Sequence, residues 1–286
     1  MPMEQRTHPA NMSRLVNALS IDLEDWFCVY NLGHAIRRED WDKQEPRVVR
    51  NTHCLLALLS KHRVTATFFV LGWVARRCPE LITEIERQGH EIGTHGYSHR
   101  LLTDMTPESF EEDLREALEV TQRCIRQPIL GFRAPSFTIT EKTLWALKIL
   151  VRNGIQYDSS IFPFGLHPDY GMPRAPLGIR RLGDALIEFP LSCAEVLGQN
   201  IPCSGGGYFR LFPYSVTKFL LRRCNEQGRP VMFYLHPWEI DPVQPRVQLS
   251  WAKTFRQYHN LDKTLGRLDR LLTDFPFTST RRVLGL

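Results

Sequence analysis

The chain has 286 residues, of which 43% are hydrophobic and 23% charged, and its formal net charge is +5. This composition is that of a globular protein with a large core, and it argues against a disordered or fibrous chain. The basic residues are spread along the sequence instead of clustered, which describes a mildly basic surface and argues against nucleic-acid binding.

The seven cysteines are odd in number and contain no C-x-x-C pair, so we expect neither a disulfide framework nor a cysteine zinc site. The N-terminal stretch is polar, and no apolar run after it is long enough for a signal peptide or a membrane span. We therefore expect a cytoplasmic protein with a flexible extension over residues 1–14.

The first half of the chain alternates predicted strands and helices. An apolar strand ends in a cluster of acids, and Thr106 followed by Pro107 is typical of a capped helix start. In chain order the elements are a strand at 16–21, a helix at 48–59, a strand at 65–71, a helix at 79–88, a strand at 91–93, a helix from 107 to about 125 and a strand at 131–133.

The second half continues this alternation less regularly. Its elements are a helix at 141–152, a strand at 156–157, long loops at 161–207 with a strand at 186–189, a helix at 213–226, a strand at 231–235 and a last helix with leucines at 261, 265, 268 and 272. Alternating strands and helices indicate a parallel sheet, and their number suggests a (β/α) barrel or a distorted relative. We expect one domain over residues 15–286.

Polar side chains follow several of the predicted strands. In such a sheet the carboxyl ends of the strands meet on one face, where catalytic groups gather. The residues at these ends are Asp22, Glu24, Asp25, His95, His99, Arg133, Asp158 and His236. Their shared placement predicts one site built from distant parts of the chain.

His95 and His99 are four residues apart, a spacing that directs both rings to one side of a helical turn. Two imidazoles with one carboxylate and an open position form a common catalytic zinc arrangement. The clustered acids would repel each other without a cation or proton, so we expect one to be a ligand and another a base. The competing interpretation is a pair of surface histidines beside a solvated acidic loop.

Three further residues are candidates for supporting roles. His236 ends an apolar strand and is a candidate general acid, although a histidine there is often structural. Arg133 is suited to orienting a carboxylate, the alternative being a surface ion pair. Asp158 is suited to orienting a neighbour, the alternative being a turn cap.

Aromatic and glycine residues suggest where a substrate binds. Trp26, Tyr97 and Trp238 each adjoin a proposed site residue, so we expect them to line the site. The segment Gly205-Gly-Gly-Tyr-Phe209 lacks a phosphate-loop lysine, which favours a close-approach substrate loop or a tight bend.

Taken in order, five motifs resemble those of the NodB-type polysaccharide deacetylases. They are Ser20-Ile-Asp-Leu-Glu-Asp-Trp26, Thr94-His-Gly-Tyr-Ser-His99, Arg133-Ala-Pro-Ser136, Tyr157-Asp-Ser-Ser160 and Leu235-His-Pro-Trp238. The resemblance spans about residues 15 to 280 and implies an α/β fold, the distorted (β/α) barrel of that family. Three segments are more narrowly similar to a subgroup found with bacterial exopolysaccharide and exosortase loci, and they are Asp22-Leu-Glu-Asp-Trp26, Gly205-Gly-Gly-Tyr-Phe-Arg210 and Tyr234-Leu-His-Pro-Trp-Glu239. Residues 160–286 are the subgroup-specific part.

The resemblance implies a role for each site residue. His95, His99 and one first-motif carboxylate hold a divalent metal, expected to be zinc, and Asp22 is the base that activates water. A backbone N–H near Pro135 and Ser136 binds the oxyanion, and both residues belong to the substrate site. His236 protonates the departing amine. Arg133 orients Asp22, and Asp158 orients His236.

Two departures from the family pattern bear on these roles. Leu23 follows Asp22 where the family has a second aspartate, so the metal carboxylate is either Glu24 or Asp25. Strand alternation favours Glu24, whereas a turn after the strand favours Asp25. Ser136 stands where many relatives have tyrosine, which a backbone donor tolerates and a ring contact does not.

The expected function is metal-dependent removal of N-acetyl groups from amino sugars of a bacterial surface polysaccharide. The expected partner is an N-acetylated glycan or its lipid-linked precursor. One alternative is a hydrolase of small cyclic or linear amides, which acetate release against ring opening would separate. The other is a glycan-binding protein without catalysis, which the intact set of base, ligands and acid argues against.

Overall fold

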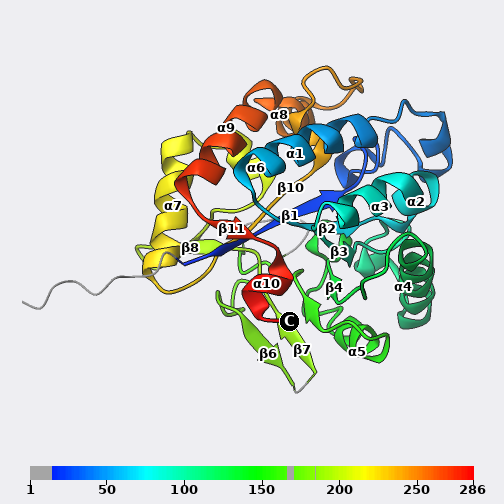
Figure 1. Cartoon of the computed structure of the whole chain (residues 1–286), viewed down its shortest axis with the longest axis horizontal. Helices are drawn as coiled ribbons and strands as arrows, with labels where there is room; N and C mark the ends of the chain where they lie inside the picture. The colour runs from blue at the N-terminus through cyan, green and yellow to red at the C-terminus, as the bar shows by residue number, and fades with distance from the viewer. Residues whose placement is uncertain (1–14, 166–170, 184) are drawn as a thin grey trace, which may run out of the picture.

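Nine strands of the described residues form one curved sheet at the centre of the molecule (Figure 1). The computed structural model describes residues 15–165, 171–183 and 185–286, and the extension predicted at 1–14 lies outside them. The strand order is β10 (Met232–Leu235), β1 (Asn17–Leu23), β2 (Thr67–Val70), β3 (Glu91–Thr94), β4 (Gly131–Phe132), β5 (Tyr157–Asp158), β7 (Leu186–Glu188) and β6 (Arg180–Leu182), and β11 (Phe277–Thr278) also pairs with β1.

The pairs from β10 to β7 are parallel, and only β6 runs antiparallel to its neighbour within this sheet. The sheet stays open between its two end strands, β10 and β6, and curls into a half-barrel, which confirms the predicted distorted (β/α) barrel. Across the opening, the amide of Met232 donates to Ser192 Oγ at 2.8 Å, and a small aromatic cluster that includes Phe162, Phe189 and Tyr234 fills the space.

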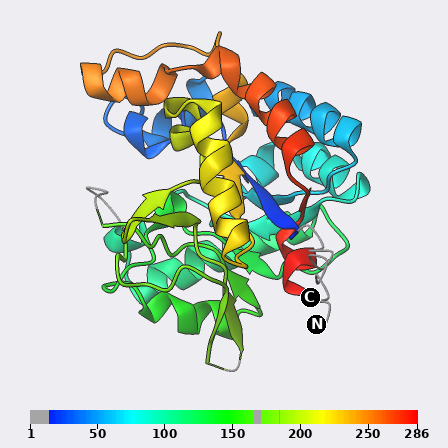
Figure 2. The same ribbon diagram turned by 90° about the vertical axis from the view of Figure 1, so that its left-hand side faces the viewer.

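Helices pack around the sheet, most of them on its outer face. They are α1 (Val48–His62), α2 (Gly72–Arg77), α3 (Pro79–Arg87), α4 (Pro107–Gln122), α5 (Trp145–Arg152), α6 (Gly206–Leu211), α7 (Tyr214–Glu226), α8 (Trp251–Tyr258), α9 (Leu261–Asp274) and α10 (Thr280–Leu284). Thr106 and Ser109 form a reciprocal capping box before α4, as the sequence indicates. The turned view places α8 and α9 in the same layer as α1 (Figure 2).

Several short elements were not predicted. They are α2, α6, α8, α10, the strands β6 and β11, and the hairpin β8 (Cys193–Val196) and β9 (Gln199–Pro202). Helix α5 also begins four residues later than predicted, because residues 141–144 form turns. Within the described residues, no helix combines the length and apolar character required to cross a membrane.

The two faces of the strands have different chemistry. In β1, Leu19, Ile21 and Leu23 join the large core beneath the helices. Ser20 and Asp22 point the other way, into the half-barrel, because side chains alternate along a strand. The carboxyl end of the sheet therefore presents polar groups inward, and the apolar side of the same strand anchors them.

The amino end of the half-barrel is closed by the last helix. Glu91 accepts hydrogen bonds from Tyr157 Oη at 2.7 Å and from the amide of Arg281 at 2.9 Å. The amide of Thr280 donates to Thr67 Oγ1 at 2.8 Å. Burial raises the pKa of Glu91, against these hydrogen bonds. The hydrogen bonds to α10 therefore close the amino end of the half-barrel. A site inside the half-barrel is expected at the carboxyl end.

Gly131 and Gly266 provide a matched test of this packing. A Cβ on Gly131 would collide with the ring of Tyr157, whereas one on Gly266, in α9, would meet open space. We expect Gly131→Ala to lower the free energy of unfolding by about 1–3 kcal/mol through overpacking. Gly266→Ala should raise it by roughly 0.5–1 kcal/mol through reduced chain entropy. Urea denaturation measures both changes. A higher free energy of unfolding in Gly131→Ala would contradict the close packing of Gly131 against the ring of Tyr157.

Candidate active site and metal centre

Asp22 and Arg133 form a fully buried ion pair inside the half-barrel. Arg133 Nη1 donates to Asp22 Oδ1 at 2.7 Å and to Ser20 Oγ at 2.6 Å. Its Nε and Nη2 donate to the carbonyl and hydroxyl oxygens of Ser159, at 3.0 and 2.8 Å. The guanidinium lies 4.2 Å from the ring centre of Phe69. Every nitrogen of the guanidinium is therefore paired, and one carboxylate oxygen of Asp22 is committed to it.

Glu24, His95 and His99 form the group suited to a metal ion, with one ligand atom of each within 4.8 Å of the others. Glu24 Oε2 lies 2.8 Å from His99 Nε2 without hydrogen-bond geometry. His95 Nδ1 hydrogen-bonds the carbonyl of Arg133 at 2.8 Å, which fixes the ring and leaves Nε2 for a ligand role. The spacing of the two histidines thus brings them together, as the sequence predicts.

The protonation states of this group suit a cation. Burial lowers the pKa of His95 to about 3, and the neighbouring His99 adds to the effect. Burial alone would raise the pKa of Glu24, but His99, His236 and His95 outweigh it and hold this pKa below its usual value. A neutral imidazole and an ionised carboxylate are the forms that bind a metal.

Asp25, the other carboxylate that the sequence left open, lies outside this group. It accepts hydrogen bonds from the amides of Trp26, Arg47 and Val48 at 2.8, 2.8 and 3.0 Å, and so stabilises the start of α1. Burial raises its pKa to about 6, against these hydrogen bonds. The three acids of the first motif therefore have different positions. Asp22 pairs with Arg133, Glu24 joins the two histidines, and Asp25 accepts hydrogen bonds at the start of α1.

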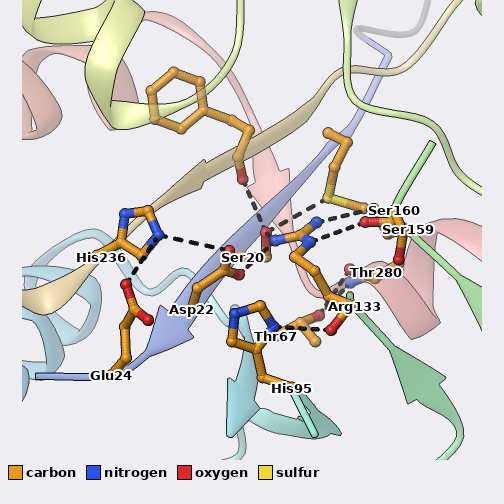
Figure 3. A network of polar contacts seen from close by, with 12 residues as sticks. Ser20, Asp22, Glu24, Thr67, His95, Arg133, Ser159, Ser160, His236 and Thr280 are labelled. Atoms are coloured by element: carbon orange, nitrogen blue, oxygen red, sulfur yellow. Dashed lines mark hydrogen bonds and ion pairs between the residues drawn. The ribbon is translucent and has the colours of Figure 1, made fainter. Parts of the chain in front are cut away.

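His236 lies between the two acidic groups. Its Nε2 is 3.5 Å from Glu24 Oε1 and 3.8 Å from Asp22 Oδ2, and Figure 3 shows Asp22 between His236 and Arg133. Its Nδ1 lies 2.5 Å from Glu239 Oε1. Burial opposes a charge on His236, but Glu239, Glu24 and Asp22 outweigh this effect and raise its pKa to about 9.

Glu239 is in turn held by Arg210, whose Nε donates to Glu239 Oε2 at 3.0 Å. Neither residue was assigned a role from the sequence. Glu239 could have been found from its place three residues after His236, on the turn η5 (Pro237–Ile240). Arg210 gives no local signal, because it comes from α6, in the segment interpreted as a glycine-rich loop.

The prediction that Asp158 orients His236 is wrong, because Glu239 occupies that position. Asp158 pairs in register with Phe132, whose side chain packs in the outer core. Side chains in register share a face, so Asp158 points away from the half-barrel. There it accepts a hydrogen bond from Ser160 at 2.5 Å and adjoins Glu188.

A cavity of about 430 Å³ opens beside these groups. Among the described residues, those that line it are Asp22, Glu24, Val29, Tyr30, Asn31, His95, His99, Ser136, Phe137, Gly207, Tyr208, Arg210, Leu211, Tyr234, His236, Trp238, Glu239, Phe255, Arg256 and His259. Ser136 and Trp238 are there as predicted. Gly207 and Tyr208 come from the glycine segment whose sequence favours a substrate loop. Arg210, Leu211 and the residues around α8 were missed, because α6 and α8 are too short for a clear periodic pattern.

Two predicted substrate aromatics lie elsewhere. Trp26 is buried in the core, and its Nε1 donates to the carbonyl of Glu45 at 3.0 Å. The ring of Tyr97 lies beneath the guanidinium groups of Arg38 and Arg76, at 5.7 and 4.7 Å, outside the cavity. A position next to a site residue in the sequence did not predict where these two side chains point, because neighbouring side chains along the chain point in different directions.

Pro135 is buried and outside the cavity lining, whereas its neighbour Ser136 is part of it. Ser136 has φ 51°, in the left-handed region, inside the short helix η4 (Pro135–Phe137). Gly206 lies against the carboxylate of Glu239, where a Cβ would collide with it. The predicted close approach at the glycine segment is thus present, although the segment is helical.

Comparisons with known proteins give the family context. Residues 41–156 match the family model described as polysaccharide deacetylase, and residues 159–285 match a domain of unknown function, DUF3473. A peptidoglycan-N-acetylglucosamine deacetylase of Bacillus cereus is 31% identical over 87 residues, 30% of this chain and 40% of the relative. A chitooligosaccharide deacetylase of Rhizobium leguminosarum bv. trifolii is 38% identical over 72 residues, 24% of this chain and 34% of the relative. The chain therefore spans two fifths or less of the length of these relatives.

Solved structures share the fold over nearly the whole chain. A candidate polysaccharide deacetylase from Mycobacterium smegmatis has a TM-score of 0.60 at 18% identity, covering 98% of this chain and 93% of that one. The peptidoglycan deacetylase PdaC of Bacillus subtilis has a TM-score of 0.50 at 13% identity, covering 96% and 91%. At these identities the likeness concerns the fold.

The buried pair of Asp22 and Arg133 predicts a large stability effect. Arg133→Met leaves the carboxylate buried without its partner and should lower the free energy of unfolding by about 3–5 kcal/mol. The control is Arg115→Met, whose ion pair with Glu111 is exposed and contributes less than about 1 kcal/mol. Urea denaturation of both variants provides the measurement. Equal losses in the two would refute the buried pair, and adding Asp22→Asn to Arg133→Met should restore part of the stability.

Proposed function

We propose that this chain, whose residues 41–156 belong to the polysaccharide deacetylase family, hydrolyses the acetamide of N-acetylated amino sugars in a glycan. The observation that carries the proposal is the meeting of Asp22, the Glu24, His95 and His99 group, and His236 at one cavity. Amide hydrolysis requires a base for water, stabilisation of the developing oxyanion and an acid for the leaving amine. The cavity offers a candidate for each.

The group of Glu24, His95 and His99 fits a divalent metal ion. Its donor set of two imidazoles and one carboxylate matches a catalytic zinc site, and Glu24 Oε2 is buried without a hydrogen-bond partner. We therefore propose that these three residues hold the ion and that zinc is the metal. Such an ion supplies a Lewis acid for a carbonyl oxygen and lowers the pKa of water.

Asp22 is the proposed general base. Arg133 holds its Oδ1, which fixes the carboxylate plane, and Oδ2 faces His236 across 3.8 Å at the cavity. A carboxylate in this position takes a proton from the attacking water during attack on the acetyl carbonyl. Ser136 is the proposed oxyanion donor through its backbone N–H, because Pro135 has none.

His236 is the proposed general acid. The carboxylate of Glu239 accepts a hydrogen bond from Nδ1–H, so in the protonated ring the second proton is on Nε2, which faces the cavity. The three surrounding carboxylates favour the protonated ring, and an acid must hold its proton until the C–N bond breaks. Arg210 keeps Glu239 ionised, since its guanidinium helps to lower the pKa of that buried carboxyl.

The names of the relatives support an amino-sugar substrate. Relatives that match part of this chain are named for deacetylation of peptidoglycan and of chitooligosaccharides. We propose a bacterial surface polysaccharide or its lipid-linked precursor as the substrate of this chain. Acetate release from such a glycan is the assay that tests it, with ring opening of a cyclic amide as the contrasting activity.

Metal content separates the proposed ligands from the proposed base. We expect His95→Ala to lose the metal and the activity together, because it removes one of three ligands. Asp22→Asn should keep the metal and lose activity, since an amide cannot accept the proton. Elemental analysis of the purified proteins and acetate release provide the two readouts.

The matched control is His53→Ala, which removes a surface histidine paired with Glu84 and should change neither readout. Full metal content in His95→Ala would overturn the ligand assignment. Full activity in Asp22→Asn would overturn the base.

Glu239→Gln tests the general acid through pH. Removing the negative charge destabilises protonated His236, so its pKa falls. A general acid is active below its pKa, and activity is lost as pH rises through it. We expect the alkaline limb of the kcat/KM profile to move to lower pH by about one unit.

Glu84→Gln is the control for this experiment, because Glu84 also pairs with a histidine but at the surface. Its profile should match that of the parent chain. An unmoved alkaline limb in Glu239→Gln would show that His236 is not the group that titrates there.

A further inference from the structure

Three aromatic rings form a continuous row along α8. Trp251 and Phe255 lie four residues apart on one face of α8, and His259, the residue directly after this helix, continues the same spacing. The rings of Trp251 and Phe255 have centroids 6.0 Å apart with planes at 22°, and those of Phe255 and His259 are 4.4 Å apart at 26°. Their nearly parallel planes make one aromatic row, one ring wide.

The row leads from solvent into the cavity of the proposed active site. Trp251 is 82% exposed and Phe255 41% exposed. Phe255 and His259 line the same cavity as Asp22 and His236. Trp251 buries too little surface to stabilise the fold, so core packing does not account for a tryptophan at this place.

The position of the row is fixed relative to the catalytic groups. Arg210 donates to the carbonyls of Arg256, Gln257 and His259 at 3.1, 3.1 and 3.0 Å. The same guanidinium pairs with Glu239, the partner of His236. One buried cation thus holds both the end of α8 and the orientation of the proposed general acid. Asn260, whose Nδ2 is 2.6 Å from His259 Nε2, sets the angle of the last ring.

We propose that the aromatic row on α8 binds sugar rings next to the unit being deacetylated, so that the chain acts on an oligosaccharide or polymer. This inference rests on the proposed function and names a binding site in the part of the chain outside residues 41–156. Sugar rings have an apolar face of C–H groups that packs on flat aromatic surfaces, and their hydroxyls stay in water.

The shape of the row favours a glycan over a lipid chain. A lipid-binding surface presents a broad apolar face, whereas this row is one ring wide. Its cavity end is bordered by the guanidinium-bearing Arg256 and the carboxylate Glu239, which suit hydroxyl groups. The row is continuous with the cavity, so one glycan chain can occupy both.

The test compares Trp251→Ala with the parent chain on N-acetylglucosamine and its oligomers of increasing length. We expect kcat/KM of the parent to rise with length, and this gain to fall about fivefold to tenfold in Trp251→Ala. The control is Phe219→Ala, which removes a ring that is 56% exposed on α7 and lies outside the cavity lining. Its dependence on length should match that of the parent.

A binding measurement makes the inference independent of turnover. In the Asp22→Asn background, isothermal titration with the longer oligomers should show weaker binding after Trp251→Ala and no change after Phe219→Ala. Absence of acetate release in the parent would count against the proposed function alone. The proposal that the aromatic row binds sugar rings would be overturned if kcat/KM depended equally on oligomer length, or if the oligomers bound equally well, with and without Trp251. Binding of phosphatidylglycerol vesicles that depends on Trp251, in place of oligomer binding, would overturn it as well.

Discussion

The charge of Arg133, buried inside the half-barrel, is the constraint on which the site depends. A buried guanidinium is costly unless every donor is satisfied. Here the partners come from β1 through Ser20 and Asp22, and from the end of β5 through Ser159. These segments lie far apart in sequence, so the pairing holds only when the strands have the correct order and register. The same contacts leave one oxygen of Asp22 facing the cavity.

Arg210 is a second buried arginine at the cavity, and it pairs with Glu239 as Arg133 pairs with Asp22. It neutralises Glu239 and binds carbonyls at the end of α8. The two arginines lie in the regions matched by the two family models, Arg133 in residues 41–156 and Arg210 in 159–285. The site therefore requires both regions, together with the β1 acids that precede them. Each arginine orients a carboxylate, and the two carboxylates flank His236.

The sequence predicted the site residues that a strand end or a short spacing marks, and it failed where contacts distant in sequence set the position of a side chain. The end of β1 and the four-residue spacing of His95 and His99 brought the expected groups together. Asp158 is the second residue of a two-residue strand, which is too short for its pattern to reveal which face Asp158 occupies. Glu239 and the ring of Trp251 lie on a turn and a short helix whose positions depend on Arg210. Such long-range contacts leave no periodic signal in the sequence.

The loop that carries Ser136 shows how the outer face of the sheet supports the inner one. Ser136 and Phe137 have φ of 51° and 55°, a conformation that costs roughly 1–2 kcal/mol per residue outside glycine. Two hydrogen bonds hold this loop. Ser160 Oγ, which donates a hydrogen bond to Asp158, accepts one from the amide of Ala134 at 2.7 Å. Thr138 Oγ1 donates a hydrogen bond to the carbonyl of Pro135 at 2.8 Å. Burial and the neighbouring Asp158 raise the pKa of Glu188, which favours the protonated form of this acid. Asp158 therefore stays buried beneath the strained loop, next to Glu188. Through Ser160 and the amide of Ala134 it helps to hold Ser136 at the cavity.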